Sequence, residues 1–227
     1  MFKNTFLWVF VGVAFKLLLG LFMALILYKK FLGKKMMTAI MLTPCAMPAS
    51  FSCMIYRLMY NPMFGHITQF LRVTHILGLP MDFLGNSKTS LIAVMIVNIW
   101  AVAPFCALNI LSTMYSSPSY IYEAARIDGA NGRQQFFSIT LPLITSSVRT
   151  LGLLIGIWAF NTFDVIYMMT QGGPANSSSI MVNFIYQNAF QFNNRGYSAA
   201  ISVVSFLILS VFAVLYVNSK GEDTRYE

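Results

Sequence analysis

The sequence predicts an all-α protein that crosses a membrane several times. Hydrophobic residues make up 57% of its 227 residues and charged residues only 10%, whereas soluble domains carry about 25% charged residues. Apolar runs of about 20 residues recur along the chain, and each is long enough to cross a hydrocarbon core of about 30 Å. The net charge of +8 comes from short loops beside these runs. That placement is typical of membrane topology signals and argues against nucleic-acid binding.

The apolar runs predict five spanning helices within a single transmembrane domain, residues 1–227. The first run is too long for a cleaved signal peptide, and no small-residue cleavage site follows it. Each run would span the bilayer at about 1.5 Å of rise per residue. The expected spans are 5–27, 36–60, 89–114, 143–170 and 198–218.

Basic residues in the connecting segments predict the orientation. The lysine-rich segment 28–35, the segment between the third and fourth spans with Arg149 just inside the fourth span, and the C-terminal tail together hold nine of them. The other side holds four, which are Lys3, Arg72, Lys88 and Arg195. Since the richer side usually faces the cytoplasm, we expect the N-terminus outside and the C-terminus inside. The polar segment 115–142 would then be a cytoplasmic loop.

This loop predicts a helix–turn–helix lying at the membrane surface. Ser117 and Pro118 are typical of an N-cap followed by the first helical residue. A helix over 118–128 would end at Gly129, and a second over 131–141 would lead into the fourth span. Its small side chains would allow another protein to approach the backbone closely.

The spacing within the loop is specific. Glu123-Ala124-Ala125 is followed by Gly129, six residues after the glutamate, and by Ile139-x-Leu141-Pro142 after nine further residues. The pattern resembles the loop by which permeases of ABC importers contact their ATPase subunits. The triplet alone would favour a solvated linker, since three residues often occur together by chance. The resemblance implies an ATPase-coupling role for Glu123, Ala124, Ala125, Asp128, Gly129, Ile139, Leu141 and Pro142.

Other segments resemble the carbohydrate (maltose/glycerol-phosphate type) permeases, namely 160–174, 186–190 and 196–200. The resemblance implies the type I importer permease fold in a bacterial cytoplasmic membrane. It also implies ATP-binding cassette ATPase subunits, a second, similar but non-identical permease, an extracytoplasmic solute-binding protein and a sugar-like solute as partners. Permeases of this family usually have one more span before the first one here, so that span is expected to be missing.

Polar groups at lipid depth are costly and are therefore candidates for function. A continuous fourth span would place Ile157, Asn161, Asp164 and Met168 on one face. Amide and carboxylate groups bind hydroxyls, and aromatic rings cover the apolar face of a sugar. The solute-path candidates are Asn161, Asp164, Tyr167, Trp158 and Phe163. Alternatively, the two polar residues only join helices within the bundle.

No catalytic constellation is evident in the sequence. The glycine-rich phosphate loop of ATPases is missing, so ATP hydrolysis is expected in a partner subunit. His66 and His75 lie nine residues apart without neighbouring cysteines or paired carboxylates, and neither a metal site nor a cofactor is expected. The alternatives are an ion-coupled secondary transporter, which would need suitably placed buried charges, and a non-functional truncated permease.

Overall fold

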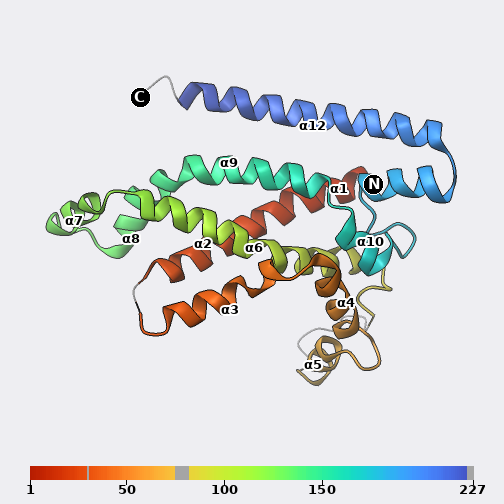
Figure 1. The fold of residues 1–227 in the computed structure, drawn as a ribbon, viewed down its shortest axis with the longest axis horizontal. Coiled ribbons are helices and arrows are strands. Elements are labelled where there is room, and N and C mark those ends of the chain that lie inside the picture. The colour runs from red at the N-terminus through yellow and green to blue at the C-terminus, as the bar shows by residue number, and fades with distance from the viewer. Residues whose placement is uncertain (30, 75–81, 224–227) are drawn as a thin grey trace. The chain divides into compact units, whose positions relative to one another are not determined.

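The computed structural model describes residues 1–29, 31–74 and 82–223, so Lys30, His75 and Arg225 lie outside the described part. The described residues form helices and turns without strands (Figure 1). They divide into two compact units. One comprises Met1–Gly12, Pro48–Asn98 and Ile155–Glu227, and the other comprises Val13–Met47 and Ile99–Leu154.

Four helices are long and apolar enough to cross a membrane, and a fifth span results if α3 and α4 are taken together as one broken span. Within the described residues, the prediction of five spans agrees with this number when the bent pair is taken as one span. The first span, Phe2–Tyr28, consists of α1 (Phe2–Phe6), η1 (Leu7–Val11) and α2 (Gly12–Tyr28), and the broken second span consists of α3 (Lys34–Ala46) and α4 (Ala49–Met59). The third is α6 (Ser90–Ser116). The fourth, Gly132–Phe160, consists of α8 (Gly132–Gln135), η2 (Phe136–Thr140) and α9 (Leu141–Phe160), and the fifth, Arg195–Val214, lies within α12 (Arg195–Asp223).

The second span is interrupted at Pro48. Met47 has an extended backbone with ψ of 133°, and Pro48 follows with ψ of 138°. Steric conflict with a proline ring disfavours helical geometry in the residue before it, which accounts for the interruption. Pro44 and Pro104 remain inside α3 and α6.

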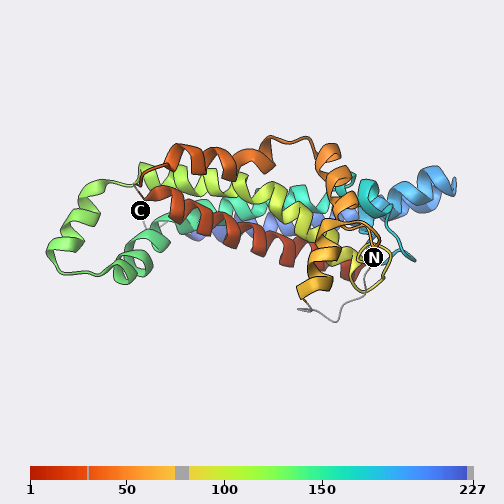
Figure 2. The same ribbon diagram turned by 90° about the horizontal axis from the view of Figure 1, so that it is seen from below.

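The unit of Val13–Met47 and Ile99–Leu154 is built on close helix contacts. A Cβ atom at Gly20 would overlap the side chain of Cys106, so only glycine permits this approach of α2 to α6. Met23 and Ala103 are buried in the adjoining core. At one end of this unit, α7 (Ser119–Ile127) and α8 extend beyond α6 and α9 (Figures 1 and 2).

The other unit holds α4, α5 (His66–Thr74), α10 (Asp164–Thr170), α11 (Met181–Tyr186), η3 (Gln187–Gln191) and α12. Its buried Trp8 donates a hydrogen bond from Nε1 to the Ala159 carbonyl at 3.1 Å. The Asn4 amide donates to the Ser177 carbonyl at 2.8 Å. α10 packs against α4. The start of the first span is thus joined to segments from the last third of the chain.

The predicted fourth span, 143–170, is wrong in its extent. The helix begins at Gly132 and ends at Phe160, and α10 is a separate helix. Asn161 Nδ2 donates to the Ile157 carbonyl at 3.0 Å, and Thr162 Oγ1 donates to the Trp158 carbonyl at 3.0 Å. The same two carbonyls also accept the Asn161 N–H, at 3.3 and 3.1 Å, so the side chains add a second partner at the last turn of the helix. The predicted common face of Ile157, Asn161, Asp164 and Met168 therefore does not form.

Candidate functional site

The predicted surface helix is present as α7, Ser119–Ile127, close to the expected 118–128. Its start differs in detail, because Pro118 is the N-cap and makes no side-chain cap. Ser117 Oγ instead donates to the Thr113 carbonyl at 3.2 Å, at the end of α6. The predicted Ser117 cap is therefore wrong, since its hydroxyl closes the preceding helix.

Gly129 ends α7 as predicted. Its φ is +79°, a conformation that residues with a Cβ rarely adopt. The Ala130 N–H bonds to the Ala125 carbonyl at 2.8 Å, and the Gly129 N–H bonds to Arg126 at 3.1 Å. This pair of bonds is the Schellman motif. A Cβ at Gly129 would meet open space, so glycine is needed there for the backbone alone.

The second arm of the loop is stabilised by a capping box. Asn131 Oδ1 accepts from the Gln134 N–H at 2.9 Å, and Gln134 Oε1 accepts from the Asn131 N–H at 2.8 Å. The helix then continues through Pro142 to Phe160, so the expected separate helix over 131–141 is wrong. A π-helical turn, η2, precedes Pro142 and shifts the hydrogen-bond register before the residue that lacks an N–H.

The exposed face of α7 carries small, charged and apolar groups. Tyr120, Glu123, Ala124 and Ile127 share this face through i, i+3, i+4 and i+7 spacing, and all four are exposed. Ile127 is 87% exposed and Tyr120 68%. Together with Tyr120, this side chain gives the exposed face of α7 an apolar component beside the Glu123 carboxylate. The sequence interpretation missed both residues, although their i, i+7 spacing was readable.

The opposite side of α7 is attached to the second arm. Tyr122 and Thr140 share a hydrogen bond of 3.2 Å between their hydroxyls, and Gln135 Nε2 donates to the Ala130 carbonyl at 2.9 Å. The other predicted coupling residues lie along the same loop. Asp128 is the exposed C-cap, Ala125, Ile139 and Leu141 are half-buried, and Pro142 is exposed.

Tyr115 connects the entrance of the loop to the lysine-rich segment. Lys34 Nζ donates to the Tyr115 hydroxyl at 2.6 Å, and that hydroxyl donates to the Leu27 carbonyl at 3.4 Å. The ring of Tyr28 lies 5.4 Å from the ring of Tyr115. The two segments expected on the cytoplasmic side therefore lie at the same end of their unit.

The predicted solute-path residues lie around the break after Phe160. Phe163 and Tyr167 stack with ring centroids 4.9 Å apart. Trp158 is 51% exposed on the last turn of α9, and Asn161 is also exposed. The exposed Asp164 occupies the first turn of α10, where the helix dipole favours a carboxylate.

Two residues that the sequence interpretation did not select complete this region. Tyr186 lies 4.7 Å from Phe163 and 5.2 Å from Tyr167 between ring centroids, and its hydrogen bond with Tyr167 raises the pKa of the Tyr186 phenol. Asn183 is 1% exposed and donates from Nδ2 to the Phe163 carbonyl at 3.1 Å. Among the described residues, no group hydrogen-bonds its Oδ1.

The sequence pattern of the binding-protein-dependent transport system inner membrane components matches residues 16–220. The chain belongs to this family. It is therefore a multi-pass inner-membrane protein, and the resemblance to importer permeases is confirmed.

Relatives and solved structures agree with this membership. A trehalose/maltose transport system permease protein MalF of Thermococcus litoralis is 34% identical, with 92% of this chain and 70% of the relative covered. The sulfoquinovosyl glycerol transport system permease protein SmoG of Agrobacterium fabrum is 32% identical over 94% of this chain and 69% of its own length.

A bacterial ABC transporter that imports the acidic polysaccharide alginate has a TM-score of 0.81 at 18% identity, over 97% of this chain and 77% of that one. The MetNI methionine ABC transporter has a TM-score of 0.63 at 19% identity, and the match covers 99% of this chain and 93% of that one. The predicted all-α importer-permease fold is confirmed.

Proposed function

We propose that this permease imports a sugar or sugar-like solute, driven by ATP that a separate ATPase subunit hydrolyses. The exposed face of α7 is the observation that supports this most directly. It offers small residues, one carboxylate and one prominent apolar side chain on a helix fixed at both ends. The sugar is supported by the names of the relatives, which transport trehalose, maltose and sulfoquinovosyl glycerol.

In this proposal α7 transmits ATPase movement. Glu123 would fix the register against a basic group of the ATPase, and Ala124 would allow close approach. Gly129 and the Schellman motif would hold the helix at its angle. Asp128, Ala125, Ile139, Leu141 and Pro142 would support or border the contact.

The same proposal places α7 in the cytoplasm, with the N-terminus outside and the C-terminus inside. The hydrogen bonds of Tyr115 support it, because they join the lysine-rich segment to the entrance of the loop. A second, similar permease subunit and an extracytoplasmic solute-binding protein would complete the transporter.

The residues around the break after Phe160 are proposed to border the solute path. Rings of Phe163 and Tyr167 would cover the apolar face of a sugar, as would Trp158, while Asn161 and Asp164 would bind its hydroxyls. Asn183 supports this proposal structurally, because its amide donates to the Phe163 carbonyl at 3.1 Å and so fixes the backbone that carries one of these rings.

Co-purification with the ATPase subunit tests the coupling role. Glu123→Lys places like charges together at the expected contact, which costs several kcal/mol, so the ATPase should be lost from the detergent-solubilised complex. Ser138→Lys is the matched control, because it adds a positive charge to an exposed position on the other arm of the same loop.

Retention of the ATPase by Glu123→Lys at the level of Ser138→Lys would contradict the role of this face. Solute uptake into vesicles that persists without ATP and follows an ion gradient would instead favour the secondary transporter.

A further inference from the structure

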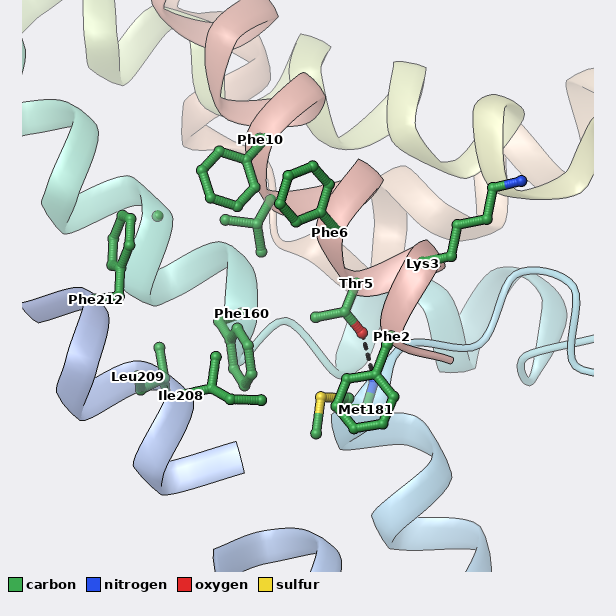
Figure 3. Close-up of a pocket in the computed structure, with 12 residues that line it drawn as sticks. Phe2, Lys3, Thr5, Phe6, Phe10, Phe160, Met181, Ile208, Leu209 and Phe212 are labelled. Carbon is green, nitrogen blue, oxygen red and sulfur yellow. Dashed lines mark hydrogen bonds between the residues drawn. The ribbon is translucent and has the colours of Figure 1, made fainter. Parts of the chain in front are cut away.

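An apolar pocket of about 440 Å³ lies within the unit of Met1–Gly12, Pro48–Asn98 and Ile155–Glu227. Figure 3 shows its aromatic walls, with Phe6 and Phe10 from the first span, Phe160 from α9 and Phe212 from α12. The Phe10 and Phe212 rings meet edge to face at 6.1 Å between centroids. Gly156 contributes no side chain, and a Cβ there would lie 3.5 Å from the Phe212 ring.

The pocket offers almost no hydrogen-bonding capacity to a ligand. The hydroxyl of Thr5, the polar side chain in its wall, accepts from the Met181 N–H at 3.0 Å and donates to the Met1 carbonyl at 3.1 Å. Water needs two or more polar partners to occupy a cavity. The occupant that suits this lining is therefore a hydrocarbon.

The surroundings of the pocket identify the source of that hydrocarbon. Three of the helices that line it are candidate membrane spans. Phe6 is 61% exposed and Phe10 48%, so the pocket is accessible from the side of these helices. Where no other polypeptide covers them, side chains exposed on the faces of membrane spans meet lipid.

Lys3 supplies a charge at the rim. Its backbone lies beside the pocket, and its ammonium group points away from the apolar walls (Figure 3). It stands on the first turn of the candidate span Phe2–Tyr28. Lysines at the ends of spans extend their ammonium groups to the headgroups, where a phosphate provides the complementary charge.

We propose that this pocket binds one acyl chain of an anionic membrane phospholipid, whose headgroup phosphate pairs with Lys3. The site is distinct from the proposed coupling loop and solute path. A lipid held there would fill the space between the first span, α9 and α12.

The test uses the whole transporter complex, reconstituted in phosphatidylglycerol nanodiscs and then released into mild detergent. Native mass spectrometry counts the phospholipid that remains bound. Ile208→Trp fills the pocket from α12, and Val211→Trp is its control, because Val211 is exposed on the same helix but does not line the pocket.

We expect wild type and Val211→Trp to retain one more phosphatidylglycerol than Ile208→Trp. An indole ring would displace about two methylenes, each worth about fourfold in binding, so retention should fall about 16-fold. Lys3→Gln should remove the preference for phosphatidylglycerol over phosphatidylcholine with the same acyl chains. ATPase association is the folding control for each variant.

Equal retention by Ile208→Trp and Val211→Trp would overturn the proposal. So would a photo-crosslink from benzoylphenylalanine at position 10 that captures a polypeptide segment instead of phosphatidylglycerol. Neither readout depends on solute or ATP, so failure here is distinguishable from failure of the importer proposal.

Discussion

In both the α7 loop and the break after Phe160, polar side chains bind backbone groups at a helix terminus, but the two regions expose different groups. In the loop, side-chain amides of Asn131 and Gln134 cap a helix start, so that small residues on α7 remain exposed. At the break, the Asn161 amide and the Thr162 hydroxyl close a helix end, and aromatic rings gather beyond it. The first arrangement leaves small side chains exposed on α7, whereas the second gathers rings and polar groups around a helix end.

The difference indicates how each region should respond to substitution. The loop depends on backbone geometry and on one exposed face, so changes there should alter ATPase association and leave solute affinity intact. The break depends on side-chain chemistry, so changes there should alter solute affinity and leave ATPase association intact. A variant that alters both properties equally would remove the distinction.

After Glu123→Lys, the largest effect is expected from Ile127→Ser. Truncation of an apolar anchor at the centre of an interface costs about 2 kcal/mol, or about 30-fold in affinity. ATPase binding to the purified permease, measured by titration, should weaken by that amount while the solute concentration for half-maximal uptake is unchanged. Phe137→Ser, an equally apolar exposed position on the second arm, should have a much smaller effect. Equal losses in both variants would mean that the α7 face is not the principal contact.

Gly129→Ala is expected to have the next largest effect on ATPase association. A Cβ at φ of +79° costs about 1–2 kcal/mol, so ATPase association should weaken about 5–30-fold. Gly132→Ala provides the control, since a Cβ also meets open space there and its φ is not positive. If both alanine variants behave alike in the same titration, backbone geometry is not what holds α7.

Asp164→Asn should weaken solute binding about fivefold to tenfold, because hydrogen bonds to a charged acceptor exceed those to a neutral one by about 1 kcal/mol. The measurement is the solute concentration for half-maximal ATP-driven uptake. Asp82→Asn makes the same substitution at an exposed position outside the break and should behave as wild type. Unchanged affinity and selectivity in both Asp164→Asn and Asn161→Ala would exclude the break from the solute path.

The smallest effect is expected from Tyr122→Phe, which removes the 3.2 Å hydrogen bond to Thr140. Its loss should cost about 1 kcal/mol, seen as hydrogen exchange of α7 amides about fivefold faster. Tyr120→Phe changes an exposed phenol of the same helix and should leave exchange as it is. Equal exchange in the two variants would show that the two arms are not joined at Tyr122.

The sequence predicted the loop better than the break, and the reason is local. Gly129 stands where a helix end requires positive φ, and this preference is independent of the rest of the fold. The helix end at Phe160 lies within an apolar stretch, so the apolar periodicity used to place the span does not mark it. The Asn-Thr-Phe-Asp segment did contain a signal, since these polar residues are typical of helix ends and starts.

Two further features were beyond prediction from the sequence. The π-helical turn before Pro142 has no residue preference that distinguishes it from an α-helix, so the continuous helix Gly132–Phe160 was divided at the proline. The exposure of Ile127 depends on the direction in which Tyr122 and Thr140 hold α7. Both are consequences of packing rather than of local preference.

The contact of Lys34 with Tyr115 affects the electrostatic potential at the entrance of the loop. A hydroxyl accepts the hydrogen bond without cancelling the charge of the ammonium group, which a carboxylate would do. Lys34 and the neighbouring Lys35 therefore keep a positive potential at this end of their unit. Such a potential is screened over about 8 Å at physiological ionic strength, so the loop entrance is where salt concentration should act on this permease.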